Sequence, residues 1–228
     1  MPKPPIVFSL GGSIIVPDQI DTGFLTAFKN LILSHLDNYQ QFIIITGGGK
    51  TARNYQQAAR DIRHVPNDDL DWLGIHSSRL NGHLMRTIFK EQADPQMLTN
   101  KRDLVARQAK ILVGAGFTPG NSTDYVATLC AQAYDVKTIV NLSNITHVYN
   151  SDPATHANAK PLETISWKSF SKLVSGDWAP GANYPFDPVA TKLARELSLE
   201  VVVMKGTDLK NLDAYLKGER FVGTIISA

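Results

Sequence analysis

The stretch Gln41 to Tyr55, QFIIITGGGKTARNY, decides the fold of this chain. Its apolar run at 42–45 predicts a buried strand, which passes through three glycines into a helix that opens near Lys50. Glycines at such a turn let the backbone approach a ligand closely, and the N-terminus of the following helix favours an anion. Lys50 and Arg53 add positive charge, and arginine can hold a phosphate through two parallel hydrogen bonds. The stretch predicts a phosphate site; a tight turn without a ligand is the simpler alternative.

This turn does not match the P-loop, whose pattern is G-x-x-x-x-G-K-[ST]. If Gly49, Lys50 and Thr51 ended that pattern, glycine would be required at position 44, where the chain has Ile44. A nucleotide bound at this turn is therefore held in another way.

Two further predicted strands also end in glycine-rich turns. The strand at 6–10 leads into GGS at 11–13, and the strand at 111–113 leads into GAGFTPGNSTD at 114–124. Ligand binding along one edge of an open parallel sheet requires such turns at the carboxyl ends of neighbouring strands. Three turns of this kind strengthen the prediction made from the first.

Strand and helix patterns alternate along the rest of the chain. Helices are predicted at 21–36, 68–89, 126–133, 166–174 and 208–216, strands at 138–142, 201–204 and 221–226, and a strand end with a turn at 144–153. Ser122 or Thr123 is the expected N-cap after the third turn, and Asp187 opens a helix with Pro188 at its first position. The segment 176–186, rich in Gly, Pro and Asn, predicts a mobile loop. We expect an α/β fold with a mainly parallel open sheet and helices on both faces, a three-layer α/β/α arrangement.

Composition agrees with an ordinary globular enzyme of one domain. The chain has 228 residues, of which 43% are hydrophobic and 19% charged, and its net charge is +2. It has no run of Lys and Arg and no apolar run of transmembrane length, so we expect no nucleic-acid partner, no membrane association and a cytoplasmic location. The single cysteine, Cys130, is expected in the core. His76 and His83 share a helix face but form no metal-ligand cluster, so no metal ligands are predicted.

Six motifs occur in a particular order along the chain. They are Gly11-Gly12-Ser13, GGGKTAR at 47–53, DLDWLGIHSSRLN at 69–81, the STD turn at 122–124, Tyr149 with Asp152-Pro153, and Asp187-Pro188 with Lys192. This order resembles that of the amino acid kinase superfamily, and within it the shorter, archaeal-type uridylate kinases. The resemblance covers essentially the whole chain, and the second and third motifs together are fairly specific for the uridylate branch.

The resemblance implies direct transfer of a phosphoryl group from ATP to UMP, with Mg²⁺ bound with the ATP and a homo-oligomer, a hexamer, as the assembly. It also implies one domain, 1–228, with an acceptor-binding part at about 1–135 and an ATP-binding part at about 136–228. By the same resemblance, the catalytic residues are Asp124, Lys192 and Arg53. The ATP-binding residues are Gly11, Gly12, Gly49, Arg53, Asn144, Tyr149 and Asp152, and the UMP-binding residues are Gly48, Asp71, Phe117, Thr118, Gly120 and Thr123.

Two departures from the family pattern keep other functions open. Many members have a lysine in the first strand where this chain has Ser9, and the usual N-V-D-G-V-Y has Thr146 and His147 in place of Asp and Gly. Histidine makes a positive φ more costly, so the ATP-side loop is expected to be reshaped. The alternatives to a UMP kinase are a catalytically silent nucleotide-binding or storage protein, and a kinase of another small acceptor.

Overall fold

The computed structural model describes residues 1–151, 153, 155–156, 158–174 and 184–228. Its centre is a seven-stranded sheet in the order β3-β2-β1-β4-β8-β9-β7. These strands are β1 (Ile6–Leu10), β2 (Phe42–Thr46), β3 (Ile111–Gly114), β4 (Thr138–Ser143), β7 (Thr164–Ser166), β8 (Glu200–Lys205) and β9 (Thr224–Ser227). The first five in this order run parallel, β9 is antiparallel to β8, and β7 is parallel to β9. The predicted mainly parallel sheet is confirmed.

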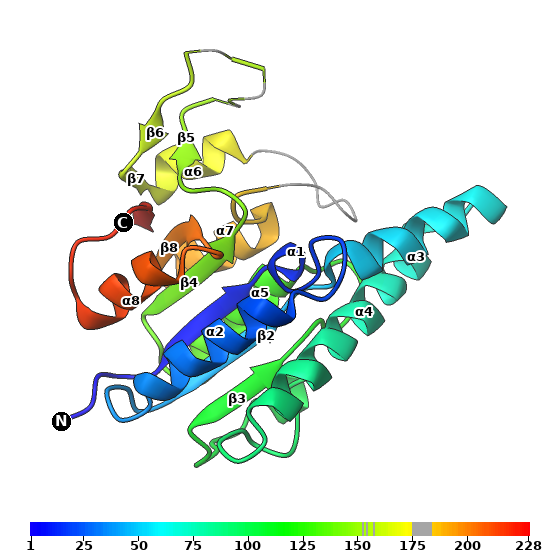
Figure 1. Cartoon of the computed structure of the whole chain (residues 1–228). Coiled ribbons are helices and arrows are strands. Elements are labelled where there is room, and N and C mark those ends of the chain that lie inside the picture. Colours follow the sequence, from blue (N-terminus) through cyan, green and yellow to red (C-terminus); the bar gives the residue numbers. More distant parts are fainter. Residues whose placement is uncertain (152, 154, 157, 175–183) are drawn as a thin grey trace.

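Helices lie on both sides of the sheet (Figure 1). Those described are α1 (Gly12–Ile15), α2 (Thr22–Ser34), α3 (Gly49–Ile62), α4 (Asn67–Ile88), α5 (Thr123–Ala133), α6 (Trp167–Leu173), α7 (Pro188–Glu196) and α8 (Leu209–Lys217). A 3-10 turn at Lys101–Asp103 and a hairpin of β5 (Val148–Tyr149) and β6 (Pro161–Leu162) complete the described elements. Helices α3 and α4 pack on each other and extend together beyond the sheet (Figure 1).

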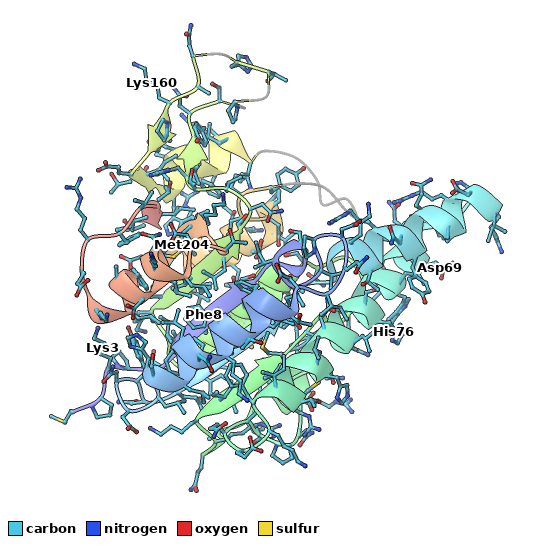
Figure 2. All side chains as sticks on the ribbon, in the orientation of Figure 1. Lys3, Phe8, Asp69, His76, Lys160 and Met204 are labelled. Carbon is cyan, nitrogen blue, oxygen red and sulfur yellow. The ribbon has the colours of Figure 1, made fainter. Side chains whose placement is uncertain are left out.

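Two hydrophobic clusters, one on each face of the sheet, form the core. Val7 belongs to the cluster shared with α5, α6 and α7, whereas Phe8 belongs to the one shared with α2, α4 and α8. Successive residues of a strand point to opposite faces, so a strand buried on both faces is apolar throughout. Phe8 is fully buried within the sheet (Figure 2) and stacks on Phe42 with 6.0 Å between ring centroids.

Short polar side chains fix where several helices begin. Ser122 caps α5 by accepting a hydrogen bond from the Tyr125 amide, as the sequence predicts. Asp187 caps α7, whose first residue is Pro188, again as predicted. Asp21, Ser166 and Asp208 cap α2, α6 and α8 in the same way.

The structure differs from the sequence-based expectations mainly at β9, the last strand along the chain, and at the short strands β6 and β7. The closing strand, predicted to start at Phe221, starts at Thr224, because Asn211 exchanges two hydrogen bonds with the backbone of Val222 and Phe221 packs on Tyr215. The strands β6 and β7 were not predicted, nor was the single turn α1. Of the predicted mobile loop 176–186, residues up to 183 lie outside the described residues.

None of the helices in the described part of the chain combines the length and the apolar character that crossing a membrane requires.

Candidate active site

The first two glycine-rich turns lie directly against each other. A Cβ atom on Gly12 would come within 2.0 Å of the amide nitrogen of Gly49, and one on Gly47 within 2.5 Å of the Gly12 nitrogen. Gly49 also has φ +64°, in the left-handed region that favours glycine. The Lys50 amide donates to the Val16 carbonyl across the same junction at 3.0 Å. These glycines are therefore required first for contact between the two turns, before any ligand is considered.

A cleft of about 250 Å³ opens beside this junction. It is lined by Gly12, Ser13, Gly47, Gly48, Gly49, Ala52, Arg53, Gln56, Asp71, Gly74, Ile75, Ser78, Gly116, Asn121, Ser122 and Thr123. Segments far apart in the sequence thus meet here: the three glycine-rich turns, the start of α3, and one face of α4. The edge of the sheet that the sequence indicated is where this cleft lies.

The predicted site residues are brought together only in part. Gly12, Gly48, Gly49, Arg53, Asp71 and Thr123 line the cleft. Gly11, Phe117, Thr118, Gly120, Asp124, Asn144, Tyr149 and Lys192 do not line it, and Asp152 lies outside the described residues.

Helix α4 holds the second glycine turn through the side chain of Asn81. The Asn81 side-chain amide donates to the carbonyl oxygen of Gly47 at 2.8 Å and to that of Gly48 at 3.3 Å. Asn81 is 4% exposed, so its bonds are shielded from water and loss of them is costly. The turn is therefore held by α4 as well as by Gly12.

The same helix holds the third turn through three further side chains. Ser78 accepts a hydrogen bond from the Gly116 amide at 3.0 Å, and Asp71 accepts one from the Gly120 amide at 2.7 Å. Arg79 donates to the carbonyl oxygens of Gly116, Phe117 and Thr99, at 3.1, 3.0 and 3.1 Å. Asp71, Ser78 and Asn81 are buried, because one face of α4 packs against both the second and the third turn.

Sequence reasoning assigned a role to Asp71 alone in this helix. The spacing of Asp71, Ile75 and Ser78 is i, i+4, i+7, so the three share a helix face with Asp71, and this signal was available in the quoted segment. The role of Arg79 was not predictable in this way, because its partners are backbone carbonyls of distant turns.

Positive charge lies at the start of α3. Arg53 lines the cleft, is exposed, and forms no ion pair or hydrogen bond with other described residues. An arginine held at a cleft without a carboxylate partner is available to an anionic ligand.

A half-buried acidic residue, Asp124, lies at the start of α5. The Ser9 hydroxyl, on β1, donates to its Oδ1 at 2.7 Å. Burial and, to a lesser extent, the neighbouring Asp187 carboxylate together raise the pKa of Asp124 to about 7. The Ser9 hydroxyl and the Asp187 backbone amide partly oppose this shift. The first-strand position thus supplies a hydrogen bond to Asp124 where many family members have a cation.

The residues expected on the ATP side are less enclosed. Asn144 is exposed and its side-chain amide donates to the Ser13 hydroxyl at 2.9 Å, while Tyr149 is half-buried on β5. Lys192 is exposed on α7, opposite the buried Ala190 and Ala194.

The backbone at His147 is ordinary. Among the described residues other than glycine, φ is positive only at Asp135 and Ser198. The histidine therefore does not occupy the left-handed conformation that a glycine would allow, and the reshaped ATP-side loop stays a prediction.

Residues 4–205 match the amino acid kinase family. The chain belongs to this family. Among its relatives, a uridylate kinase from Methanospirillum hungatei is 34% identical over 98% of this chain and 95% of its own length. One from Thermoplasma acidophilum is 33% identical over 97% of this chain and 96% of its own length.

Solved structures give the same result for this amino acid kinase. The crystal structure of uridylate kinase from Archaeoglobus fulgidus superimposes with a TM-score of 0.83 at 28% identity, covering 97% of this chain and 99% of the other. That of UMP kinase from Ureaplasma parvum gives 0.77 at 18% identity with both chains covered in full, which supports the fold alone.

Proposed function

We propose that this chain is a uridylate kinase, which transfers the γ-phosphoryl group of ATP to UMP and forms ADP and UDP for pyrimidine nucleotide synthesis. The observation that carries the proposal is the cleft where two interlocked glycine turns meet Arg53 and the buried Asp71, in a chain similar over its full length to uridylate kinases. In the transfer, a phosphate oxygen of UMP forms a bond to the γ-phosphorus while the bond to the β-γ bridging oxygen breaks. Such a reaction needs alignment and charge neutralisation more than covalent chemistry.

We assign the acceptor, UMP, to the side of the cleft that α4 lines. Asp71 accepts hydrogen bonds from the nucleoside, Gly48 and Thr123 line the phosphate, and Phe117, Thr118 and Gly120 belong to the turn that wraps the base. In support, Asp71 already accepts one amide hydrogen bond from that turn, so its carboxylate faces the cleft and the turn together. A bound nucleoside exchanges with or adds to this bond.

ATP is assigned to the opposite side. Gly11, Gly12 and Gly49 contact its phosphates through the backbone, and Asn144, Tyr149 and Asp152 surround adenine and ribose. The hydrogen bond from Asn144 to Ser13 supports this, because it joins the ATP-side loop to the turn that carries Gly11 and Gly12.

Three residues act on the transferring group. Arg53 binds the phosphoryl oxygens, and Lys192 adds a second cation from α7. Asp124 holds these cations in line, a role for which a carboxylate fixed at the start of α5 by the Ser9 hydroxyl is suited. Developing negative charge on the γ-phosphoryl group is stabilised by such fixed cations.

We propose that magnesium binds together with ATP. The described residues contain no group of three or more His, Cys, Asp or Glu side chains placed to hold a metal. Mg²⁺ commonly keeps several waters and uses one or two carboxylates plus substrate phosphates, and Asp124 and Asp187 lie close enough together to raise the pKa of Asp124. Bound to ATP, the ion would neutralise charge between the β- and γ-phosphates.

The broader assignments follow from the same resemblance. We propose one domain, 1–228, with the acceptor part at about 1–135 and the ATP part at about 136–228. We also propose a cytoplasmic location, where ATP and UMP are found, and a homo-oligomer, a hexamer by family resemblance. Exposed Tyr55, Ile62, Trp72 and Leu80 on the extended α3–α4 pair support self-association (Figure 1).

A coupled assay of ADP release with UMP, CMP, AMP and GMP tests the reaction. We expect UMP to be preferred, with AMP and GMP disfavoured by about 10⁴, because a base pocket built for hydrogen bonds rejects bases that leave its groups unpaired. Nucleotide binding without ADP release would instead support the storage protein, and ADP release with a different acceptor would support the other kinase.

Calorimetry with Asp71→Ala tests the acceptor site. This variant should weaken UMP binding and leave ATP binding largely intact. Asp69→Ala is the matched control, since Asp69 is exposed on the same helix (Figure 2). The uridylate assignment is wrong if UMP does not bind the unaltered protein, or if Asp71→Ala abolishes ATP binding and spares UMP.

A further inference from the structure

The N-termini of α5 and α7 meet beside the cleft, and each helix is capped by a residue that also bonds the other helix. Ser122 caps α5, accepting from the Tyr125 amide at 3.1 Å, and its hydroxyl donates to Oδ2 of Asp187. Asp187 caps α7 with its other oxygen, Oδ1, which accepts from the amides of Val189 and Ala190 at 2.7 and 2.9 Å. The two caps are thus one connected group of hydrogen bonds.

A second contact joins the same two helices. The Asp187 carboxylate and backbone amide both lie close enough to Asp124, on α5, to shift the pKa of that residue, the carboxylate upward and the amide downward. The α5 cap therefore bonds the α7 cap, and the start of α7 lies against the carboxylate of α5. We call this pair of contacts, between Ser122 and Asp187 and between Asp187 and Asp124, the cap bridge.

The Asp187 end of the cap bridge is buried and held from the sheet. Asp187 is 3% exposed and the preceding Phe186 is fully buried. The Asn141 side chain, on β4, donates to the Pro185 carbonyl at 2.9 Å, which fixes the approach to α7. Buried hydrogen bonds of this kind resist opening, so they set the relative position of the two helices.

We propose that Asp187 is a positioning residue for phosphoryl transfer: through the cap bridge it sets α7, with Lys192, against the start of α5, with Asp124. The proposal rests on the proposed function, because Asp124 and Lys192 are the groups that it positions. Asp187 does not line the cleft, so its effect on the reaction passes through other residues. Displacement of catalytic groups by about 1 Å can cost about 10²-fold in rate.

The test uses substitutions that alter the bridge, with matched changes at caps elsewhere. Asp187→Asn keeps an oxygen to cap α7 but replaces the acceptor of the Ser122 hydroxyl by an amide. Asp208→Asn makes the same change at α8, where the carboxylate caps the helix and does not line the cleft. Ser122→Ala removes the bridge and the α5 cap, Ser122→Thr keeps the hydroxyl, and Ser166→Ala removes only the α6 cap.

We expect Asp187→Asn to lower kcat by about tenfold or more while the KM for UMP changes by less than about threefold. The double variant of Ser122→Ala and Asp187→Asn should be no slower than the slower single variant, since both substitutions disrupt the same cap bridge. Ser122→Thr should restore most of the rate lost in Ser122→Ala. The controls Asp208→Asn and Ser166→Ala should leave kcat nearly unchanged, and Ser166→Ala should lower the melting temperature because it removes the α6 cap.

Binding of ATP without acceptor separates this proposal from the proposed function. Asp187→Asn should weaken ATP binding by about threefold or more relative to Asp208→Asn, whichever acceptor the enzyme uses. Failure of the unaltered protein to use UMP would contradict the uridylate assignment but not the positioning role of Asp187. The positioning role is overturned if Asp187→Asn matches Asp208→Asn in both kcat and ATP affinity, or if the losses in the double variant multiply.

Discussion

Replacing Asp124 by asparagine is expected to make the nucleotide-free protein more stable at alkaline pH and to reduce its activity. Burial and the nearby Asp187 raise the pKa of Asp124 from 3.8 to about 7. An acid whose pKa is raised on folding binds its proton more tightly in the folded state. Ionisation of Asp124 therefore lowers the free energy of unfolding. This free energy is greatest below the pKa of the unfolded state, and it falls as the pH rises through the pKa of the folded state.

The size of this effect follows from the shift. About three pKa units at about 1.4 kcal/mol each give a cost of about 4 kcal/mol at about pH 8, and about 1.5 kcal/mol at about pH 5. Asparagine keeps an oxygen that can accept the hydrogen bond from Ser9, which is 2.7 Å from Asp124 in this structure. The stability gained by Asp124→Asn should therefore grow by about 2–3 kcal/mol between about pH 5 and about pH 8.

Urea unfolding of both proteins across this range measures the difference. Asp213→Asn is a control of opposite sign, because hydrogen bonds from Lys217 and His35 lower the pKa of Asp213 and its loss should destabilise the folded protein above the unfolded pKa. A gain from Asp124→Asn that does not change with pH would refute the reasoning, since it would mean that this carboxylate is not desolvated. Turnover should fall at every pH, by about tenfold or more, since the orienting charge is lost.

Two further predictions concern the cation and the glycine junction. Lys192→Ala should lower turnover by about 10²–10³ with little change in melting temperature, because Lys192 is exposed and its loss removes charge but no packing; near-normal turnover would remove it from the catalytic set. Gly12→Ala should unfold the protein or cost about 3 kcal/mol or more, since its Cβ would lie 2.0 Å from the Gly49 nitrogen. Gly23→Ala, within α2, is its control: the nearest atom to the added Cβ would be Oδ1 of Asp21 at 3.4 Å, so urea unfolding should show a change of less than about 1 kcal/mol. Equal behaviour of the two variants would contradict the close contact.

Much of the fold was predictable because its central strands are apolar runs that end at glycines. The first strand, Ile6–Leu10, has the predicted bounds, and the second, Phe42–Thr46, is one residue longer. These strands are buried on both faces, so their composition alone distinguishes them. The short strands β6 and β7 have no such signal. Each has two or three residues, none of them fully buried, and forms only by pairing with a distant strand.

The site was predictable in its segments but not in its connections. The glycine turns and Arg53 are local patterns, and the structure brings them to one cleft. The hydrogen bonds that hold the site join residues far apart in sequence: Ser9 to Asp124, Ser122 to Asp187, and Arg79 to Gly116. No spacing rule relates such pairs, because the sheet order decides which strand ends become neighbours.

The residue at position 9 shows why this matters for function. From the sequence, Ser9 is a missing cation, which weakens the case for catalysis without refuting it. In the structure its hydroxyl bonds a carboxylate that has no ion pair among the described residues and whose pKa is near neutrality. A cation brought to Asp124 by bound nucleotide or by Lys192 would lower that pKa and favour the ionised form, which the proposed role of Asp124 requires. Serine thus leaves a carboxylate whose charge depends on an occupied site, and the loss of the lysine is compatible with catalysis.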